Sequence, residues 1–134
     1  MEIMFKNLNL GALGFRASFF EAVELAKVGD FQGMDVDVRE MKELLKTKSV
    51  DEIKSLLKDK GLKLGGWGLP INIKADEETY RKDLESLPEL AQIGRELGCF
   101  RVATWIMPYS DSLSFKDNFE FHAKRLRPVA DILE

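Results

Sequence analysis

Residues 98–108 read GCFRVATWIMP and have the pattern of a β-strand whose two faces differ. Successive side chains of a strand point to opposite sides, so Phe100 and Val102 share one face while Arg101 and Trp105 share the other. In an open sheet with helices on both faces, central strands are nearly continuous apolar runs. The alternation therefore indicates a sheet that packs helices on one face and tolerates polar groups on the other.

Strand-like and helical segments alternate along the whole chain, four of each. Ser18 with Glu21 and Ser49 with Glu52 have the spacing of capping boxes, which marks the start of two helices. Crossovers of this length require parallel strands with the helices packed outside them. The strand-like segments are residues 4–13, 31–38, 62–70 and 98–108, and the helical segments are residues 18–30, 49–61, 75–98 and 115–134.

Polar residues of the other strand-like segments also fall on one face. Asn7 and Asn9 alternate with apolar residues, and so do Asp35 and Asp37. A barrel interior accepts such side chains, above all near the C-terminal strand ends, where the active sites of TIM barrels lie. An inward Arg101 needs a partner because burying a lone guanidinium is costly. We expect a structural ion pair between Arg101 and Asp35.

The length of the chain limits how much of a barrel it can form. A complete TIM barrel has roughly 250 residues, and this chain has 134 residues with four strand–helix units. We therefore predict an α/β fold, the (βα)4 half of a TIM barrel, as a single domain over residues 1–134 and as the N-terminal part of a longer barrel. An open flavodoxin-like sheet is the alternative, and it leaves the polar strand faces unexplained.

The composition, 45% hydrophobic and 32% charged residues, is that of an ordinary globular domain. The net charge of −3, without a basic cluster, argues against a nucleic-acid partner. No apolar run reaches membrane-spanning length, and the first residues lack a signal-peptide pattern. We expect a cytoplasmic protein with no membrane partner. The single cysteine, Cys99, begins an apolar strand and is expected to be a buried, unreactive thiol.

Four stretches together resemble the sugar phosphate isomerase/epimerase family, which consists of xylose isomerase-like (βα)8 barrels related to endonuclease IV. The resemblance runs the length of the chain, and residues 98–111 followed by the RLRPVA segment are its most specific part. It identifies the chain with the N-terminal half of such a barrel only. The four stretches are FQGMDVD (residues 31–37), GGWGLP (65–70), GCFRVATWIMPYSD (98–111) and HAKRLRPVADIL (122–133).

The resemblance implies proton transfer next to a sugar carbonyl, assisted by a divalent metal ion, in the complete protein. Family members hold that metal with Glu, Asp, His and Glu at the ends of strands five to eight. The sequence offers no such strand, and Glu134 belongs to a helix end. We therefore assign neither a catalytic residue nor a metal ligand, and we expect the 134-residue chain alone to bind no catalytic metal and to be inactive.

Asn9, Trp67 and Trp105 are the candidate substrate-binding residues. Aromatic faces stack on the carbon side of a sugar while polar groups fix its hydroxyls. Filling the barrel core is the alternative role for both tryptophans. The glycines within residues 65–68 either allow close backbone approach to a ligand or mark tight barrel geometry. His122 lies in the middle of a helical segment, where packing or exposure is the commoner outcome.

A four-stranded parallel sheet leaves a free backbone edge on each outer strand, and free edges recruit partners. We therefore expect either a homodimer or association with the missing C-terminal half, and a small sugar or sugar phosphate as the ligand of the complete protein. Two other functions stay open. One is a non-catalytic half-barrel that acts by self-assembly, and the other is a DNA-repair relative of endonuclease IV, which the acidic net charge disfavours.

Overall fold

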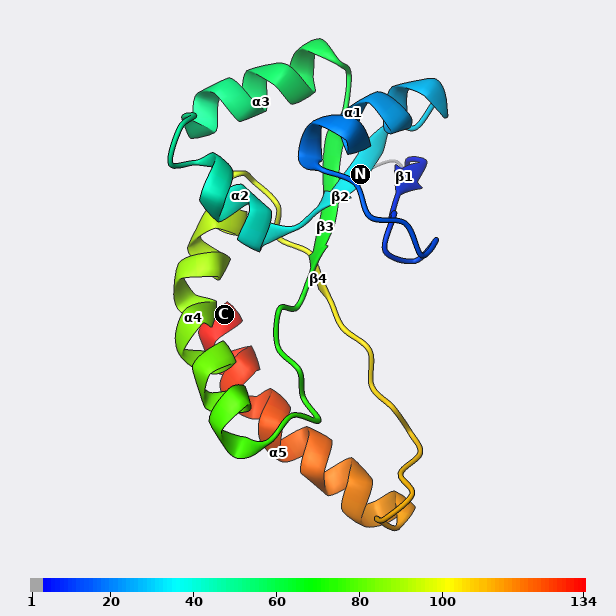
Figure 1. Ribbon diagram of the computed structural model, residues 1–134, viewed down its shortest axis with the longest axis vertical. Helices are drawn as coiled ribbons and strands as arrows, with labels where there is room; N and C mark the ends of the chain where they lie inside the picture. Colours follow the sequence, from blue (N-terminus) through cyan, green and yellow to red (C-terminus); the bar gives the residue numbers. More distant parts are fainter. Residues whose placement is uncertain (1–3) are drawn as a thin grey trace.

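The computed structural model describes residues 4–134, and Figure 1 shows four strands alternating with helices along this part of the chain. The order confirms the α/β class and the four strand–helix units expected from the sequence. The strands are β1 (Asn7–Leu8), β2 (Gly33–Val36), β3 (Lys63–Gly68) and β4 (Val102–Ala103), and the helices are α1 (Phe19–Val28), α2 (Val38–Leu44), α3 (Val50–Asp59), α4 (Glu77–Glu96) and α5 (Phe115–Leu133).

The four strands form one parallel sheet in the order β1-β2-β3-β4. Each strand pairs with the next strand in sequence, which is the arrangement of consecutive units in a TIM barrel. β1 and β4 are the outer strands, and each has only two residues in its ladder. The sheet is therefore a strip whose two edges are the first and the last strand.

Helix α2 is an element that the sequence pattern did not reveal. It begins at Val38 directly after β2, and the Oδ1 atom of Asp37 accepts a hydrogen bond from the backbone N–H of Arg39 at 2.8 Å. The expectation that Asp37 continues a strand face is therefore wrong, because its carboxylate caps a helix instead. The short helix turns the chain back toward α3.

The predicted capping boxes are present at the start of α1 and α3. The Ser49 hydroxyl accepts from the Glu52 backbone N–H at 3.1 Å, and the Glu52 carboxylate accepts from the Ser49 N–H at 2.6 Å. Ser18 and Glu21 form the same reciprocal pair at α1. Hydrogen bonds from the serine backbone, and then from its hydroxyl, lower the pKa of Glu52 and of Glu21.

The fourth strand is much shorter than the sequence predicts. Only Val102 and Ala103 pair with β3, and the chain from residue 104 to residue 111 runs on without a ladder. Phe100, expected to face a helix, is 76% exposed. The physical reason is that β4 has a neighbour on one side only, while α5 packs against α4. Cys99 is buried as expected, and its burial raises the pKa of its thiol.

The hydrophobic core lies between the helices and one face of the sheet. Met34 and Val36 on β2 and Leu8 on β1 are buried on this face, and α1 covers β2. The opposite face carries the polar side chains of Asn7 and Asp35, as the alternation predicts. The main buried helix residues are Phe19, Ala22, Val23, Ala26, Met41, Ile53, Leu57, Leu87, Leu90 and Ile93.

An irregularity in the β2–β3 ladder decides the orientation of Trp67. Met34 pairs with Leu64, yet Val36 pairs with Trp67, so Asp35 lies opposite both Gly65 and Gly66. One extra residue on a strand turns every later side chain to the other face. Trp67 therefore shares the helix-facing side of Val36, and not the polar face on which a substrate-binding residue was expected.

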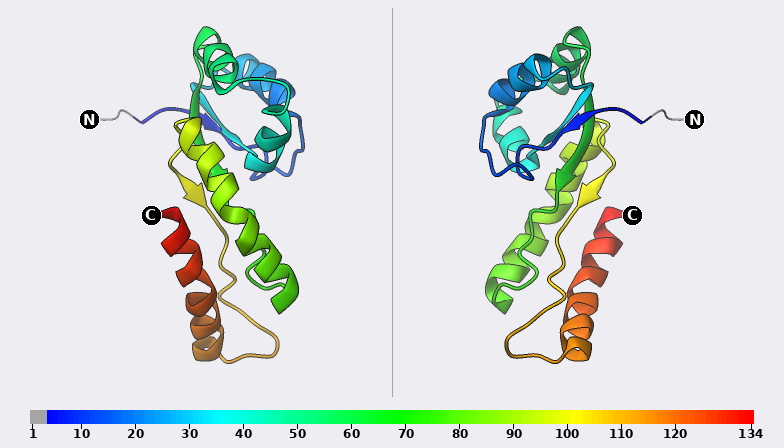
Figure 2. Two further views of the ribbon diagram at one scale, coloured as in Figure 1. Left: turned by 90° about the vertical axis from the view of Figure 1, so that its left-hand side faces the viewer. Right: turned by 90° about the vertical axis from the view of Figure 1, so that its right-hand side faces the viewer.

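Helices α4 and α5 lie side by side and project beyond the sheet, together with the connections that follow β3 and β4, so the molecule is elongated (Figure 2). Within residues 4–134, no helix is both long enough and apolar enough to span a membrane.

Candidate functional site

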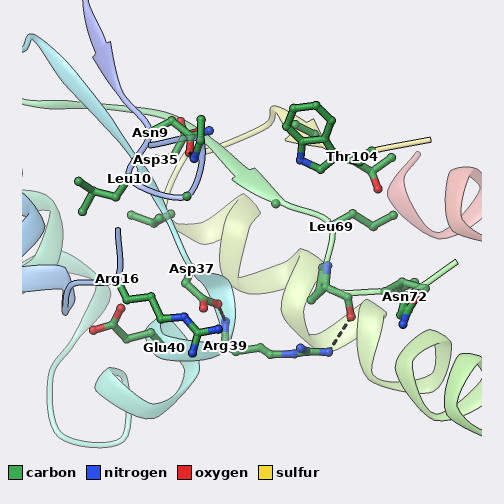
Figure 3. Close-up of a pocket in the computed structure, with 18 of the residues that line it drawn as sticks. Asn9, Leu10, Arg16, Asp35, Asp37, Arg39, Glu40, Leu69, Asn72 and Thr104 are labelled. Carbon is green, nitrogen blue, oxygen red and sulfur yellow. Dashed lines mark hydrogen bonds between the residues drawn. The ribbon is translucent and has the colours of Figure 1, made fainter. Parts of the chain in front are cut away.

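A cavity of about 990 Å³ opens at the C-terminal ends of the strands, bounded by the connections that follow all four of them. Active sites of TIM barrels lie at this end. Figure 3 shows its lining side chains converging from separate loops. The polar and aromatic lining residues are Asn9, Arg16, Asp35, Asp37, Arg39, Glu40, Asn72, Lys74, Thr104, Trp105 and His122.

Two asparagines hold the Asp35 carboxylate on the polar face of the sheet. Asn7 donates from Nδ2 to Oδ1 of Asp35 at 2.8 Å, and Asn9 donates from Nδ2 to Oδ2 at 2.9 Å. The Asn9 Oδ1 atom accepts from the backbone N–H of Ala12 at 2.9 Å, which fixes the orientation of the amide. Asn9, a predicted binding residue, thus lies in the cavity wall and presents an oriented amide.

Asp35 and Arg101 lie near each other on the polar face of the sheet, on either side of Gly66. A Cβ atom placed on Gly66 would lie 3.6 Å from the Asp35 Oδ1 atom and 3.6 Å from the Arg101 Cβ atom. Asp35 and Arg101 therefore flank Gly66 on the polar face, from β2 and from the start of β4. Asn7 and Asn9 both donate hydrogen bonds to Asp35, and a direct Asp35–Arg101 ion pair stays a prediction.

The two tryptophans have opposite environments. Trp105 borders the cavity from the connection after β4 and is 86% exposed, so its indole face is open to a ligand. Trp67 is 3% exposed, and its Nε1–H donates to the backbone oxygen of Cys99 at 3.1 Å. Trp67 also packs against Gly94 of α4. The structure brings Asn9 and Trp105 to one cavity, and the environment of Trp67 matches the core role.

The charged end of the cavity comes from residues that the sequence pattern did not single out. Arg39 donates from Nη2 to the backbone oxygen of Pro70 at 2.6 Å, which ties the start of α2 to the connection after β3. Glu40 accepts from the backbone N–H of Phe19 at 2.7 Å. Figure 3 shows Arg16 beside Glu40 at this end. Arg39 and Glu40 reach the cavity because helix α2 begins directly after β2. Recognising residues 38–44 as a helix is therefore the sequence signal that could have identified these two residues.

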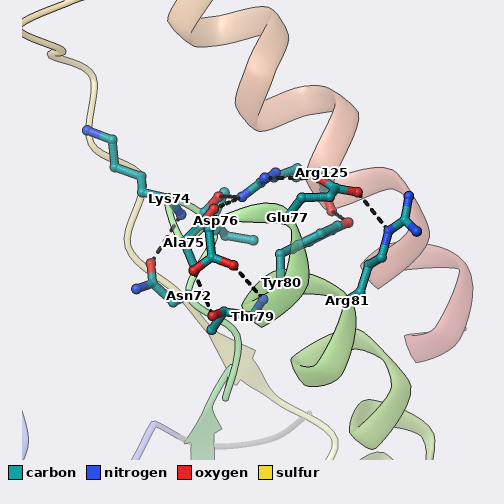
Figure 4. Close-up of polar contacts among 10 residues, drawn as sticks. Asn72, Lys74, Ala75, Asp76, Glu77, Thr79, Tyr80, Arg81 and Arg125 are labelled. Carbon is teal, nitrogen blue, oxygen red and sulfur yellow. Dashed lines mark hydrogen bonds and ion pairs between the residues drawn. The ribbon is translucent and has the colours of Figure 1, made fainter.

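Arg125 on α5 fixes the connection between β3 and α4. Its guanidinium donates to the backbone oxygens of Ile73, at 2.8 Å, and of Ala75. The guanidinium also lies over the ring of Tyr80, 4.5 Å from the ring centre, and pairs with Glu77 at 3.2 Å (Figure 4). Asn72 and Lys74 line the cavity from this connection, so Arg125 positions part of the cavity wall.

No metal site is evident in the described part of the chain. Residues 4–134 contain no group of three or more His, Cys, Asp or Glu side chains that could hold a metal ion. His122 is 4% exposed, and its Nδ1 atom lies 2.8 Å from the backbone oxygen of Asn118, which assigns the proton to Nδ1. The residues present here therefore do not fit the divalent metal that the resemblance implies.

Comparison with solved structures identifies the fold. A zinc-bound IOLI protein superposes with a TM-score of 0.73 at 14% identity, covering 98% of this chain and 48% of that one. A xylose isomerase domain protein from Alicyclobacillus acidocaldarius gives 0.60 at 21% identity, covering 85% and 43%. A D-psicose 3-epimerase from Clostridium cellulolyticum, solved with D-tagatose, gives 0.60 at 15% identity, covering 88% and 44%.

The chain thus spans about half the length of the solved structures that it matches. No protein-family model matches its sequence, and no curated protein matches it significantly. At these identities the likeness establishes the fold, which is half of a TIM barrel. The predicted (βα)4 half-barrel is confirmed.

Proposed function

We propose that this chain is the N-terminal half of a sugar isomerase or epimerase, as a single (βα)4 domain that supplies the substrate-holding wall of the active site. The observation that carries the proposal is the cavity at the strand ends, which is lined by both the exposed indole of Trp105 and the oriented amide of Asn9. Among proteins of this fold are a xylose isomerase domain protein and a D-psicose 3-epimerase, and both names refer to sugars.

The chemistry of the lining fits a hydroxylated ligand without net charge. Three cationic side chains (Arg16, Arg39 and Lys74) and three carboxylates (Asp35, Asp37 and Glu40) line the cavity, so their formal charges cancel. Amides, carboxylates and guanidinium groups together offer both donors and acceptors to sugar hydroxyls. The indole of Trp105 supplies the flat apolar surface on which the C–H face of a sugar stacks.

In this proposal, residues outside the described part of the chain carry out the proton transfer. The described residues hold no metal-binding group, and Cys99, whose pKa is raised by burial, stays a neutral thiol. In the proposal, the chemical groups and any divalent metal belong to the complementary half of the barrel. The chain contributes binding and orientation, which catalysis also needs because a correctly held substrate reacts faster. Cytoplasmic location stays a prediction.

Saturation-transfer NMR with a panel of free pentoses and hexoses, their phosphates and a sugar-free diacid tests the proposal. We expect saturation to reach the free sugars, and to fall strongly in Trp105→Ala, while the diacid shows none. A panel in which no sugar receives saturation, or in which Trp105→Ala behaves as the unchanged protein does, contradicts the proposal.

A further inference from the structure

The connection between β4 and α5 carries Trp105 along a stretch that has no strand partner. The ladder of β4 ends at Ala103, and the chain runs on toward α5 as the extended segment seen in Figure 1. Trp105 and Met107 of this connection line the cavity, and they are 86% and 53% exposed. Their side chains pack against little, so contacts of the backbone decide where the Trp105 indole lies.

Trp105 lies midway between two backbone anchors. On one side, the Ala103 oxygen accepts from the backbone N–H of Leu69 at 2.8 Å. On the other side, the Met107 oxygen accepts from the Nδ2 atom of Asn118 at 2.8 Å. Each anchor is two residues from Trp105, and two residues of extended chain span at most about 7 Å. Both anchors together confine the Trp105 backbone, whereas the first anchor alone leaves the chain free to swing.

Helix α5 presents Asn118 to this connection on a face that is polar and buried. The Ser114 hydroxyl caps the helix by accepting from the backbone N–H of Asp117 at 3.1 Å, which fixes where the helix begins. Asn118 and His122 are four residues apart, share one face and are 2% and 4% exposed. Arg125, one turn after His122, ties the connection that follows β3. The first half of α5 therefore holds both connections that border the cavity at its side.

The bond from Asn118 is a firmer tie than the one from Lys74, which also reaches this connection. Lys74 donates from Nζ to the Tyr109 oxygen at 3.4 Å, and its side chain is exposed. The Asn118 bond is shorter, and its donor is shielded from water, so it is electrostatically stronger.

The amide of Asn118 is retained although packing alone disfavours it. Its Oδ1 atom is buried and has no hydrogen-bond partner within residues 4–134. A buried acceptor without a partner destabilises a folded chain, and an apolar side chain avoids that cost. The reverse orientation of the amide would set its oxygen against the Met107 oxygen, so the observed orientation is fixed. The Nδ2 donor is therefore what the asparagine contributes.

From these observations we propose that Asn118 is a positioning residue of the cavity, which holds the Trp105 indole at the cavity wall through the Met107 oxygen. The proposal rests on the sugar-binding function proposed above. A sugar meets an indole that is already in place, and it loses no affinity to ordering the connection.

Backbone ¹⁵N relaxation of the labelled chain tests the positioning without any ligand. Asn118→Leu keeps the branching at Cγ and removes the donor, and Gln92→Leu makes the same chemical change on the exposed surface of α4 as a control. We expect the order parameters of Trp105 and Met107 to fall from about 0.85 to below about 0.6 in Asn118→Leu, and to stay unchanged in Gln92→Leu. The Trp67 N–H, bonded within the sheet, is the internal reference and should stay ordered in every variant.

A second variant covers the case in which leucine does not fit. Asn118→Ala also lacks the donor and is smaller than asparagine, so it repeats the test without crowding. Far-UV circular dichroism and urea unfolding verify that each variant is folded. A merely structural role of Asn118 lowers the urea midpoint but leaves the order of Trp105 and Met107 equal to that of the unchanged chain, and this result would overturn the proposal.

Sugar affinity, followed by saturation transfer, is the second readout. We expect Asn118→Leu to bind a sugar about tenfold more weakly than the unchanged chain, because the sugar must then order the connection. Lost order at Trp105 with an unchanged sugar affinity also contradicts the proposal. If the unchanged chain binds no sugar while the variants lose order at Trp105, the proposed function is refuted and the positioning of Trp105 by Asn118 stands.

Discussion

Trp105 and Trp67 differ in their expected roles: Trp105 is expected to bind a ligand, and Trp67 is expected to stabilise the fold. Trp105 is 86% exposed and Trp67 is 3% exposed. We expect Trp105→Ala to change the free energy of unfolding by no more than about 0.5 kcal/mol, because its indole packs against little. Trp67→Ala removes a core indole and should cost about 3–5 kcal/mol. Urea unfolding of both variants measures this difference, and equal losses would place Trp105 in the core.

Gly65 packs so closely against the Asn7–Asp35 hydrogen-bond network that a larger side chain there would clash with it. A Cβ atom there would lie 2.2 Å from the Oδ1 atom of Asn7, whose amide is held by Asp35, whereas nothing lies within 4 Å of a Cβ atom on Gly68. We expect Gly65→Ala to lower the free energy of unfolding by about 1–3 kcal/mol. Gly68→Ala is the matched control and should be neutral or slightly stabilising. A thermal melt in which both variants match the unchanged chain would contradict this network.

Sequence reasoning at the residue scale was correct where strand alternation is regular. The polar sides of β1 and β2 follow from alternation, and Asn9 and Asp35 lie there as expected. It failed at Trp67, because the two glycines before it add one residue to β3 opposite Asp35. Side-chain parity cannot register an irregularity that depends on pairing with another strand, and consecutive glycines were the only local sign of it.

At the scale of elements, the capping box of α3 gives a pH dependence with a defined sign. Hydrogen bonds from Ser49 lower the pKa of Glu52 below its ordinary value of 4.5. A carboxylate with a lowered folded-state pKa stabilises fully above its unfolded pKa, and loses that contribution as the pH falls through the folded pKa. We therefore expect the stability difference between the unchanged chain and Glu52→Gln to be largest near neutral pH and to shrink below pH 4.5.

Urea unfolding at several pH values measures this trend for α3. Lys54→Gln, on the same helix and without a capping role, is the control and should show no such change with pH. A Glu52→Gln difference that stays constant as the pH falls would mean that the Ser49 contacts do not stabilise the charged carboxylate.

Element boundaries were predictable where local chemistry decides them. The serine caps of α1 and α3 and the glycine after α4 agree with the sequence, and Gly98 has a φ of 77° that favours glycine. β4 and α2 were mispredicted for a different reason. The length of β4 depends on a second neighbouring strand, and the start of α2 depends on Asp37 turning from strand to cap. Both are decided by tertiary contacts.

At the scale of the whole molecule, the described residues form half of a TIM barrel with two outer strands. The sheet ends in two outer strands, and the cavity opens beside them. The accessible surface of 9284 Å² also exceeds the about 7,100 Å² of a compact monomer of 15.3 kDa. The chain matches about half the length of complete barrels. We propose that further strands pair with β1 and β4, which would explain these features together.

Amide hydrogen exchange at Val102 tests this central claim most directly. The Val102 N–H faces the open edge, whereas the neighbouring Trp67 N–H is bonded to Arg101 within the chain and serves as an internal reference. We predict that exchange at Val102 slows as the protein concentration rises, until it approaches that of Trp67. If Val102 exchanges as fast as a free amide at every concentration while Trp67 stays protected, no strand pairs with β4 and the account is contradicted.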